Sequence, residues 1–137
     1  MTAVFELNPV LERDTLPIMI TSTSELRLMN DARFPWCILI PRIQGLTEWH
    51  QLPPAAHGPV MAEIASVSEV LIAEPLVTKL NVGALGNRVP QLHIHVVGRH
   101  PGDPAWPDPV WGYGVARPYA EGAAWPLITR LRNEVQG

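Results

Sequence analysis

The amino-acid sequence predicts an α+β domain in which helices pack on an antiparallel sheet of about five strands. Short apolar segments of strand length lie in pairs on either side of one long helical segment, with short connections between them. There are too few helical segments for a doubly wound parallel sheet. Because a chain of 137 residues has the usual length of one domain, we expect residues 1–137 to form a single domain.

Two strands are expected before the long helix. Residues 25–30 alternate polar and apolar side chains, as in a half-buried strand, and a turn follows. Residues 36–41 are apolar on both faces, which indicates a central strand.

Residues 5–16 have apolar side chains at helical spacing before a Thr-Leu-Pro sequence, and they predict a short helix.

The long helix is predicted over residues 57–76, where apolar side chains recur every three or four positions between prolines. Strands at residues 79–85 and 91–99 follow, joined by a loop of turn-forming residues. Residues 101–119 are rich in proline and tryptophan and predict an irregular segment of the same domain. A last helix is expected at residues 122–135.

Composition restricts the partners and the cellular setting. A formal net charge of -3 gives no long-range positive field for nucleic acid, although a few amides and one arginine can still bind a small anion. Cys37 is the only cysteine, so an intrachain disulfide is excluded and a reducing compartment is favoured. No apolar stretch reaches the roughly 18 residues that a membrane span needs. We therefore expect a cytoplasmic protein without a membrane or nucleic-acid partner.

The strand at residues 91–99 carries the candidate chemistry. Because side chains alternate along a strand, Gln91, His93 and His95 share one face, while the residues between them face the core. Two imidazoles two strand rises apart, roughly 6 to 7 Å, can bind a metal, act as an acid and a base, or act as nucleophile and helper. They can also be ordinary polar residues on an exposed face. The loop before the strand is rich in glycine, and its backbone amides could receive phosphate oxygens.

The run Gln-Leu-His-Ile-His-Val-Val-Gly-Arg at residues 91–99 resembles the signature of the histidine triad (HIT) superfamily, in which three histidines alternate with apolar residues. The resemblance extends over about residues 26–111. It implies binding of a small nucleotide and hydrolysis or transfer at its α-phosphate through a covalent nucleotidyl-histidine. It implies neither a metal nor another cofactor.

By this resemblance His93 is the nucleophile, His95 is the third triad position and Gln91 replaces the first histidine. Further residues are candidates for contacts with the nucleotide and its phosphates: Asn30, Asn81, Asn87 and Arg99. For Arg99, at the end of the strand, a solvated position is the alternative.

Two departures from the family pattern concern catalysis. Gln91 stands where the family has a histidine, and the family's additional histidine in an earlier strand falls at Cys37. Gln91 can still donate and accept hydrogen bonds, so either a rebuilt active site or loss of catalysis is possible. Cys37 is otherwise expected to be a buried small residue.

The irregular segment contains Trp106 and Trp111 beside prolines. In several HIT dimers a C-terminal Trp-Pro segment approaches the partner's active site, and the similarity implies a homodimer with one of these tryptophans near the neighbouring site. A segment folded over its own core is the alternative.

Three functions follow from these patterns. The first is a nucleotide hydrolase or transferase acting on diadenosine polyphosphates or nucleoside phosphoramidates. The second is a nucleotide-binding regulatory protein without catalysis. The third is a metal-dependent cupin-like enzyme, which also uses His-x-His on a strand but needs a nearby Glu and a later His within an all-β fold. Residues 96–102 contain no Glu, and a long helix precedes the strand.

Overall fold

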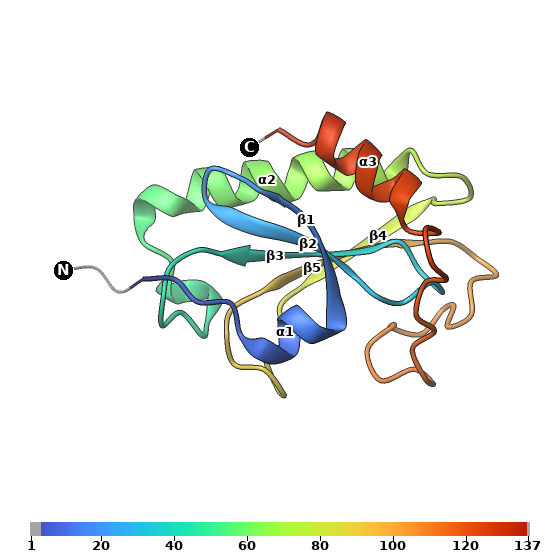
Figure 1. Cartoon of the computed structure of the whole chain (residues 1–137), viewed down its shortest axis with the longest axis horizontal. Helices are drawn as coiled ribbons and strands as arrows, with labels where there is room; N and C mark the ends of the chain where they lie inside the picture. Colours follow the sequence, from blue (N-terminus) through green and yellow to red (C-terminus); the bar gives the residue numbers. More distant parts are fainter. Residues whose placement is uncertain (1–3, 137) are drawn as a thin grey trace.

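The computed structural model describes residues 4–136, which form a five-stranded antiparallel sheet in the order β1-β2-β3-β5-β4 (Figure 1). The expected α+β fold is confirmed. The strands are β1 (Thr15–Ile20), β2 (Ser24–Met29), β3 (Trp36–Pro41), β4 (Lys79–Gly83) and β5 (Ile94–Arg99). β1 and β4 form the two edges of the sheet.

Strand β1 occupies residues that the sequence assigned in part to a helix. The helix predicted over residues 5–16 is only α1 (Pro9–Asp14), and β1 begins directly after it. Asn8 caps α1, because its side chain accepts a hydrogen bond of 2.8 Å from the Val10 amide. Pro17 is accommodated because β1 is an edge strand with an irregular register between Pro17 and Met19. The Thr-Leu-Pro sequence therefore begins an edge strand.

Two helices cover one face of the sheet, α2 (Pro54–Ile72) and α3 (Trp125–Glu134), and both lie on the same side in Figure 1. They correspond to the helices predicted at residues 57–76 and 122–135. The larger core lies between these helices and the sheet, and it includes Leu92, Ile94 and Val96 around β5. The apolar face predicted for the histidine strand is therefore buried against helices.

The opposite face of the sheet is also covered. A second core joins Leu11 of α1, Ile38 of β3, Val97 of β5 and Val110 of the segment after β5. This segment, residues 100–124, contains no helix or strand, and Figure 1 shows it folded beside the sheet on its way to α3. We call residues 100–112 the strap. All six residues of β5 are consequently buried.

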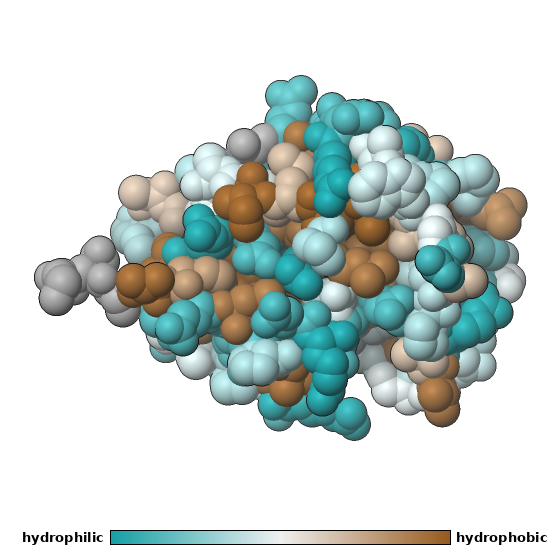
Figure 2. Space-filling model, viewed as in Figure 1, coloured by the Kyte–Doolittle hydropathy of each residue, from teal (hydrophilic) through white to brown (hydrophobic). Residues whose placement is uncertain are grey.

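The face of the molecule seen in Figure 2 mixes hydrophobic and hydrophilic residues, shown in brown and teal. None of the helices within residues 4–136 combines the length and the apolar content that crossing a bilayer requires.

Candidate active site

A cavity of about 440 Å³ lies on the face of the sheet opposite α2 and α3, and His93 and His95 line it. Apolar walls come from α1 and β2, and aromatic walls from β3 and the strap. The loop between β4 and β5 supplies polar side chains. The principal lining residues besides the histidines are Val10, Leu11, Met29, Trp36, Asn87, Arg88 and Trp111.

His93 stands directly before β5, and its own chain orients the ring. The Nδ1 atom lies 2.7 Å from the backbone carbonyl oxygen of Gln91. A carbonyl oxygen only accepts hydrogen bonds, so Nδ1 carries the proton and donates. Burial lowers the pKa of His93, while the hydrogen bond to Gln91 opposes this shift. Near neutral pH the ring is therefore uncharged, with a free electron pair on Nε2.

His95 is held in the opposite tautomer. The indole Nε1 of Trp36 lies 2.9 Å from Nδ1 of His95. Because an indole N–H only donates, Nδ1 must accept, and the proton of the neutral ring is on Nε2. Burial, together with the nearby His93, lowers the pKa of His95 to about 3. The two ring centroids are 4.8 Å apart, so two neutral rings of opposite tautomer are neighbours in the cavity.

Trp36, and not Cys37, is the β3 residue on the histidine face. The register pairs Trp36 with Val97 and Ile38 with His95, and directly paired residues share a face of the sheet. Cys37 points into the helix-side core with no exposed surface, and burial raises the pKa of its thiol. The comparison of Cys37 with the family's additional histidine therefore identified the wrong position. Alternation along β3 shows that the side chains of Trp36 and Cys37 point to opposite faces of the sheet. Only the pairing with β5 shows which of them lies on the same face as His95.

Gln91 contributes to the site through its backbone. Its side chain Oε1 accepts from the Asn8 amide at 2.8 Å, and its Nε2 donates to the Glu6 carbonyl at 2.9 Å. These bonds hold the N-terminal segment that leads into α1. The backbone carbonyl of the same residue holds His93.

The structure brings only some of the other candidates to the cavity. Asn87 lines it, and so does Arg88, which the sequence analysis missed although it follows Asn87 in the same loop. Asn30 lies elsewhere: its Oδ1 accepts from the Tyr119 amide at 2.9 Å, and it lines a separate cavity beside α3. Asn81 is bonded to Arg99.

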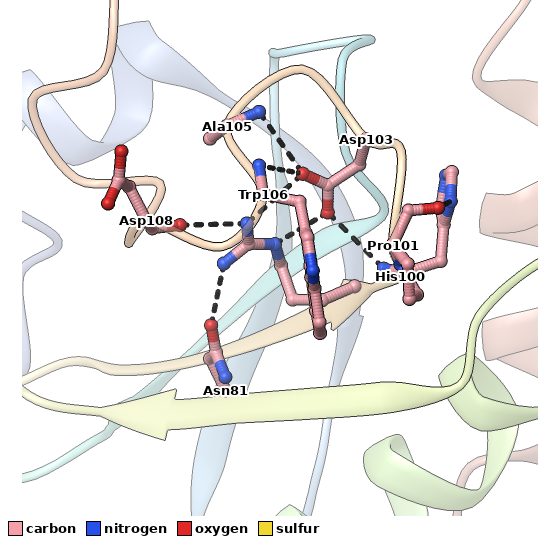
Figure 3. Close-up of polar contacts among 8 residues, drawn as sticks. Asn81, His100, Pro101, Asp103, Ala105, Trp106 and Asp108 are labelled. Atoms are coloured by element: carbon pink, nitrogen blue, oxygen red, sulfur yellow. Dashed lines mark hydrogen bonds and ion pairs between the residues drawn. The ribbon is translucent and has the colours of Figure 1, made fainter.

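Arg99 is a buried clamp for the strap. Its guanidinium donates to both carboxylate oxygens of Asp103 at 2.7 and 3.1 Å, to Oδ1 of Asn81 at 2.7 Å and to the Asp108 carbonyl at 2.8 Å (Figure 3). Trp106 lies against it, with 5.6 Å between the guanidinium carbon and the ring centroid. Arg99 is 2% exposed, so neither the solvated position nor the phosphate contact considered from the sequence fits this geometry.

The clamped strap places Trp111 at the histidines of its own chain. The Trp111 ring lies 5.4 Å from the His95 ring, measured between centroids, and the two rings are nearly perpendicular at 81°. Its Nε1 is the one buried side-chain polar atom without a hydrogen-bond partner within residues 4–136. Trp106 does not line this cavity. It lies over Arg99 and is 37% exposed.

The described part of the chain holds no group of three or more His, Cys, Asp or Glu side chains arranged to bind a metal. The open α+β sheet also differs from the all-β fold that the cupin-like alternative requires.

Comparison with known proteins agrees with this fold. Residues 11–102 match the HIT domain. A histidine triad protein from Sinorhizobium meliloti 1021 is 40% identical, with 96% of this chain and 97% of that chain covered and a TM-score of 0.92. A histidine triad protein from Marinobacter aquaeolei VT8 is 38% identical, with 97% of each chain covered and a TM-score of 0.93.

A third histidine triad structure, from Bradyrhizobium japonicum, is 35% identical, with 97% of this chain and 99% of that chain covered and a TM-score of 0.93. A search of curated proteins returned no match. The chain belongs to the HIT family. Its strap extends beyond the residues that match the HIT domain.

The buried ion pair between Arg99 and Asp103 predicts that the Asp103 carboxylate contributes strongly to the stability of the fold. Asp103→Ala leaves Arg99 buried without its ionic partner, and we expect the free energy of unfolding to fall by about 3 to 5 kcal/mol. Asp108→Ala is the matched control, because Arg99 bonds only the backbone carbonyl of that residue, and we expect a change within about 0.5 kcal/mol. Urea denaturation of both variants tests this, and equal losses would contradict the clamp.

The buried neutral histidines predict a loss of stability in mild acid. Because the folded pKa of His95, about 3, lies below the ordinary value of 6.5, the unfolded chain binds the proton first as the pH falls. The stabilisation is therefore present above pH 6.5 and decreases towards about pH 3. Each such histidine contributes a slope of about 1.4 kcal/mol per pH unit.

Urea denaturation between about pH 7.5 and 4.5, above the titration of most carboxylates, measures this slope. The His95→Asn variant should show a shallower dependence than the wild type. The same slope in both proteins would show that His95 is protonated in the folded state.

Proposed function

We propose that this protein is a nucleotide hydrolase or transferase that acts at the α-phosphate through His93. The observation that carries the proposal is the hydrogen bond of 2.7 Å between His93 Nδ1 and the Gln91 carbonyl. It keeps the electron pair of the neutral ring on Nε2, the nitrogen that is free to attack. Membership of the HIT family supports the same chemistry.

The dimensions and lining of the cavity suit a nucleotide. Its volume of about 440 Å³ lies in the usual range for small-molecule sites. The apolar side chains of Val10, Leu11 and Met29 offer a surface for the nucleoside, while Asn87 and Arg88 offer polar groups for its phosphates.

The reaction has two steps. The Nε2 electron pair of His93 forms a bond to the α-phosphorus, and the leaving group departs with the electrons of the bond that breaks. Water or another acceptor then attacks phosphorus and releases its proton to the solvent, while the electrons of the N–P bond return to Nε2. Throughout, the Gln91 carbonyl accepts from Nδ1 and stabilises the positive charge that develops on the ring.

Replacing the nucleophile tests the proposal. His93→Asn should abolish the covalent nucleotidyl-protein and lower turnover of diadenosine polyphosphates or adenosine phosphoramidate by roughly 1000-fold or more. Acid quenching with an α-phosphate-labelled substrate, followed by mass spectrometry, detects the intermediate. His50→Asn is the control, since His50 is exposed and outside the cavity. Turnover retained by the His93 variant would contradict the mechanism.

A regulatory nucleotide-binding protein is the second candidate. It is favoured by Gln91, because the side chain at the first triad position bonds the N-terminal segment instead of a catalytic ring. Nucleotide binding by the wild type without turnover or labelling would support this candidate over the enzyme.

We also propose that the protein is a homodimer. β4 is an edge strand, and edge strands pair readily with a second copy. Beside it Trp49, Met61 and Val82 are about half exposed and line an apolar groove of about 520 Å³. Light scattering should give about twice the chain mass of 15.1 kDa, and Met61→Glu should shift the mass towards the monomer. A wild-type monomer at micromolar concentration would contradict the proposal.

A further inference from the structure

The inference concerns the leaving group and rests on the proposed function. Two histidines stand side by side, yet their Nδ1 atoms make opposite hydrogen bonds: one donates to Gln91 and the other accepts from Trp36. Of the two rings only His95 has its proton on Nε2, and its ring centroid lies 4.8 Å from that of His93, the ring whose Nε2 attacks. What this N–H can do depends on whether His95 can take up a second proton.

Trp36 opposes that second proton. An imidazolium carries a hydrogen on both nitrogens, so a protonated His95 would direct its Nδ1–H at the indole N–H, which is 2.9 Å away by its nitrogen. The indole cannot easily turn aside, because Phe34 and Trp111 pack edgewise against it with centroid distances of 6.3 Å each. Trp36 is 7% exposed, so water cannot readily replace it.

No other group lining the cavity supplies an acid for the leaving group. His93 Nδ1–H is committed to the Gln91 carbonyl. Asp14 is ion-paired with Arg13 at 2.8 Å and is an acceptor when ionised. Arg88 is the only Lys or Arg that lines the cavity, and it makes no ion pair with the residues that the structure describes.

We propose that Trp36 is a positioning residue that keeps His95 a neutral Nε2–H donor, so that the site prefers phosphoric anhydrides to phosphoramidates. In an anhydride the leaving group departs as a phosphate anion. The electron pair of the broken P–O bond stays on the leaving-group oxygen. His95 Nε2–H donates a hydrogen bond to this oxygen without transferring its proton, and the Arg88 guanidinium stabilises the negative charge of the leaving group. In a phosphoramidate the departing amine must gain a proton, which this site withholds.

The first test compares two substrates that transfer the same nucleotide to His93, diadenosine triphosphate and adenosine 5′-phosphoramidate. For the wild type, kcat/KM should be about 100-fold higher for the anhydride, the usual contribution of one general acid. Trp36→Phe keeps an aromatic ring but removes the donor. It should reduce this preference at least about 10-fold, with the phosphoramidate rate rising as the pH falls below about 6.5. Trp125→Phe changes an exposed tryptophan that lines neither this cavity nor the groove beside β4, and it should leave the preference unchanged.

Two further measurements do not depend on how well the Phe variant folds. ¹⁵N NMR of histidine-labelled wild type should show His95 as the neutral Nε2–H tautomer down to about pH 5. Arg88→Ala should lower kcat/KM for the anhydride at least about 10-fold more than it lowers the value for the phosphoramidate.

The outcomes separate this inference from the proposed function. If the wild type turns over the phosphoramidate as fast as the anhydride, still through a nucleotidylated His93, the function stands and the inference fails. A doubly protonated His95 at neutral pH, or an unchanged preference in Trp36→Phe, also overturns the inference. If neither substrate labels His93, the proposed function itself fails.

Discussion

The double burial of β5 is the constraint on which the site depends. β3 and β4 pair with its two edges, helices cover one face, and α1 and the strap cover the other. The imidazoles of His95 on this strand and of His93 directly before it are both buried, so each Nδ1 atom needs a partner within the protein. The Gln91 carbonyl and the Trp36 indole provide partners of opposite kind. Neighbouring histidines thereby acquire different tautomers, one leaving an electron pair free and the other presenting an N–H.

Part of the cover over the histidines follows the residues that match the HIT domain. The HIT domain match ends at residue 102, whereas Asp103 and Trp111 belong to the part of the strap that follows. A buried ion pair often adds little net stability. An arginine in such a pair nevertheless fixes the positions of its partners, because the five N–H donors of its planar guanidinium have defined directions. The Arg99 clamp uses that property to bring Trp111 to within 5.4 Å of His95, between ring centroids.

The glutamine at the first triad position shows how one residue serves two structural roles. Its carbonyl orients the His93 ring, and its side chain amide binds both a donor and an acceptor of the N-terminal segment. The segment held by Gln91 leads into α1, whose Val10 and Leu11 form the apolar wall of the cavity.

The sequence alone determined the features that depend on local periodicity: the strands at residues 25–30 and 36–41, the long helix, the shared face of His93 and His95, and the family signature. Tertiary structure decided what depends on pairing between distant segments. Edge strand β1 forms its backbone hydrogen bonds only with β2. The register between β3 and β5 places Trp36, and not Cys37, on the face of His95. The Arg99 side chain is buried because it bonds Asp103 and Asn81 inside the protein. Alternation along a strand shows which residues share a face, but the partner strands and the covering segments determine what each face contacts.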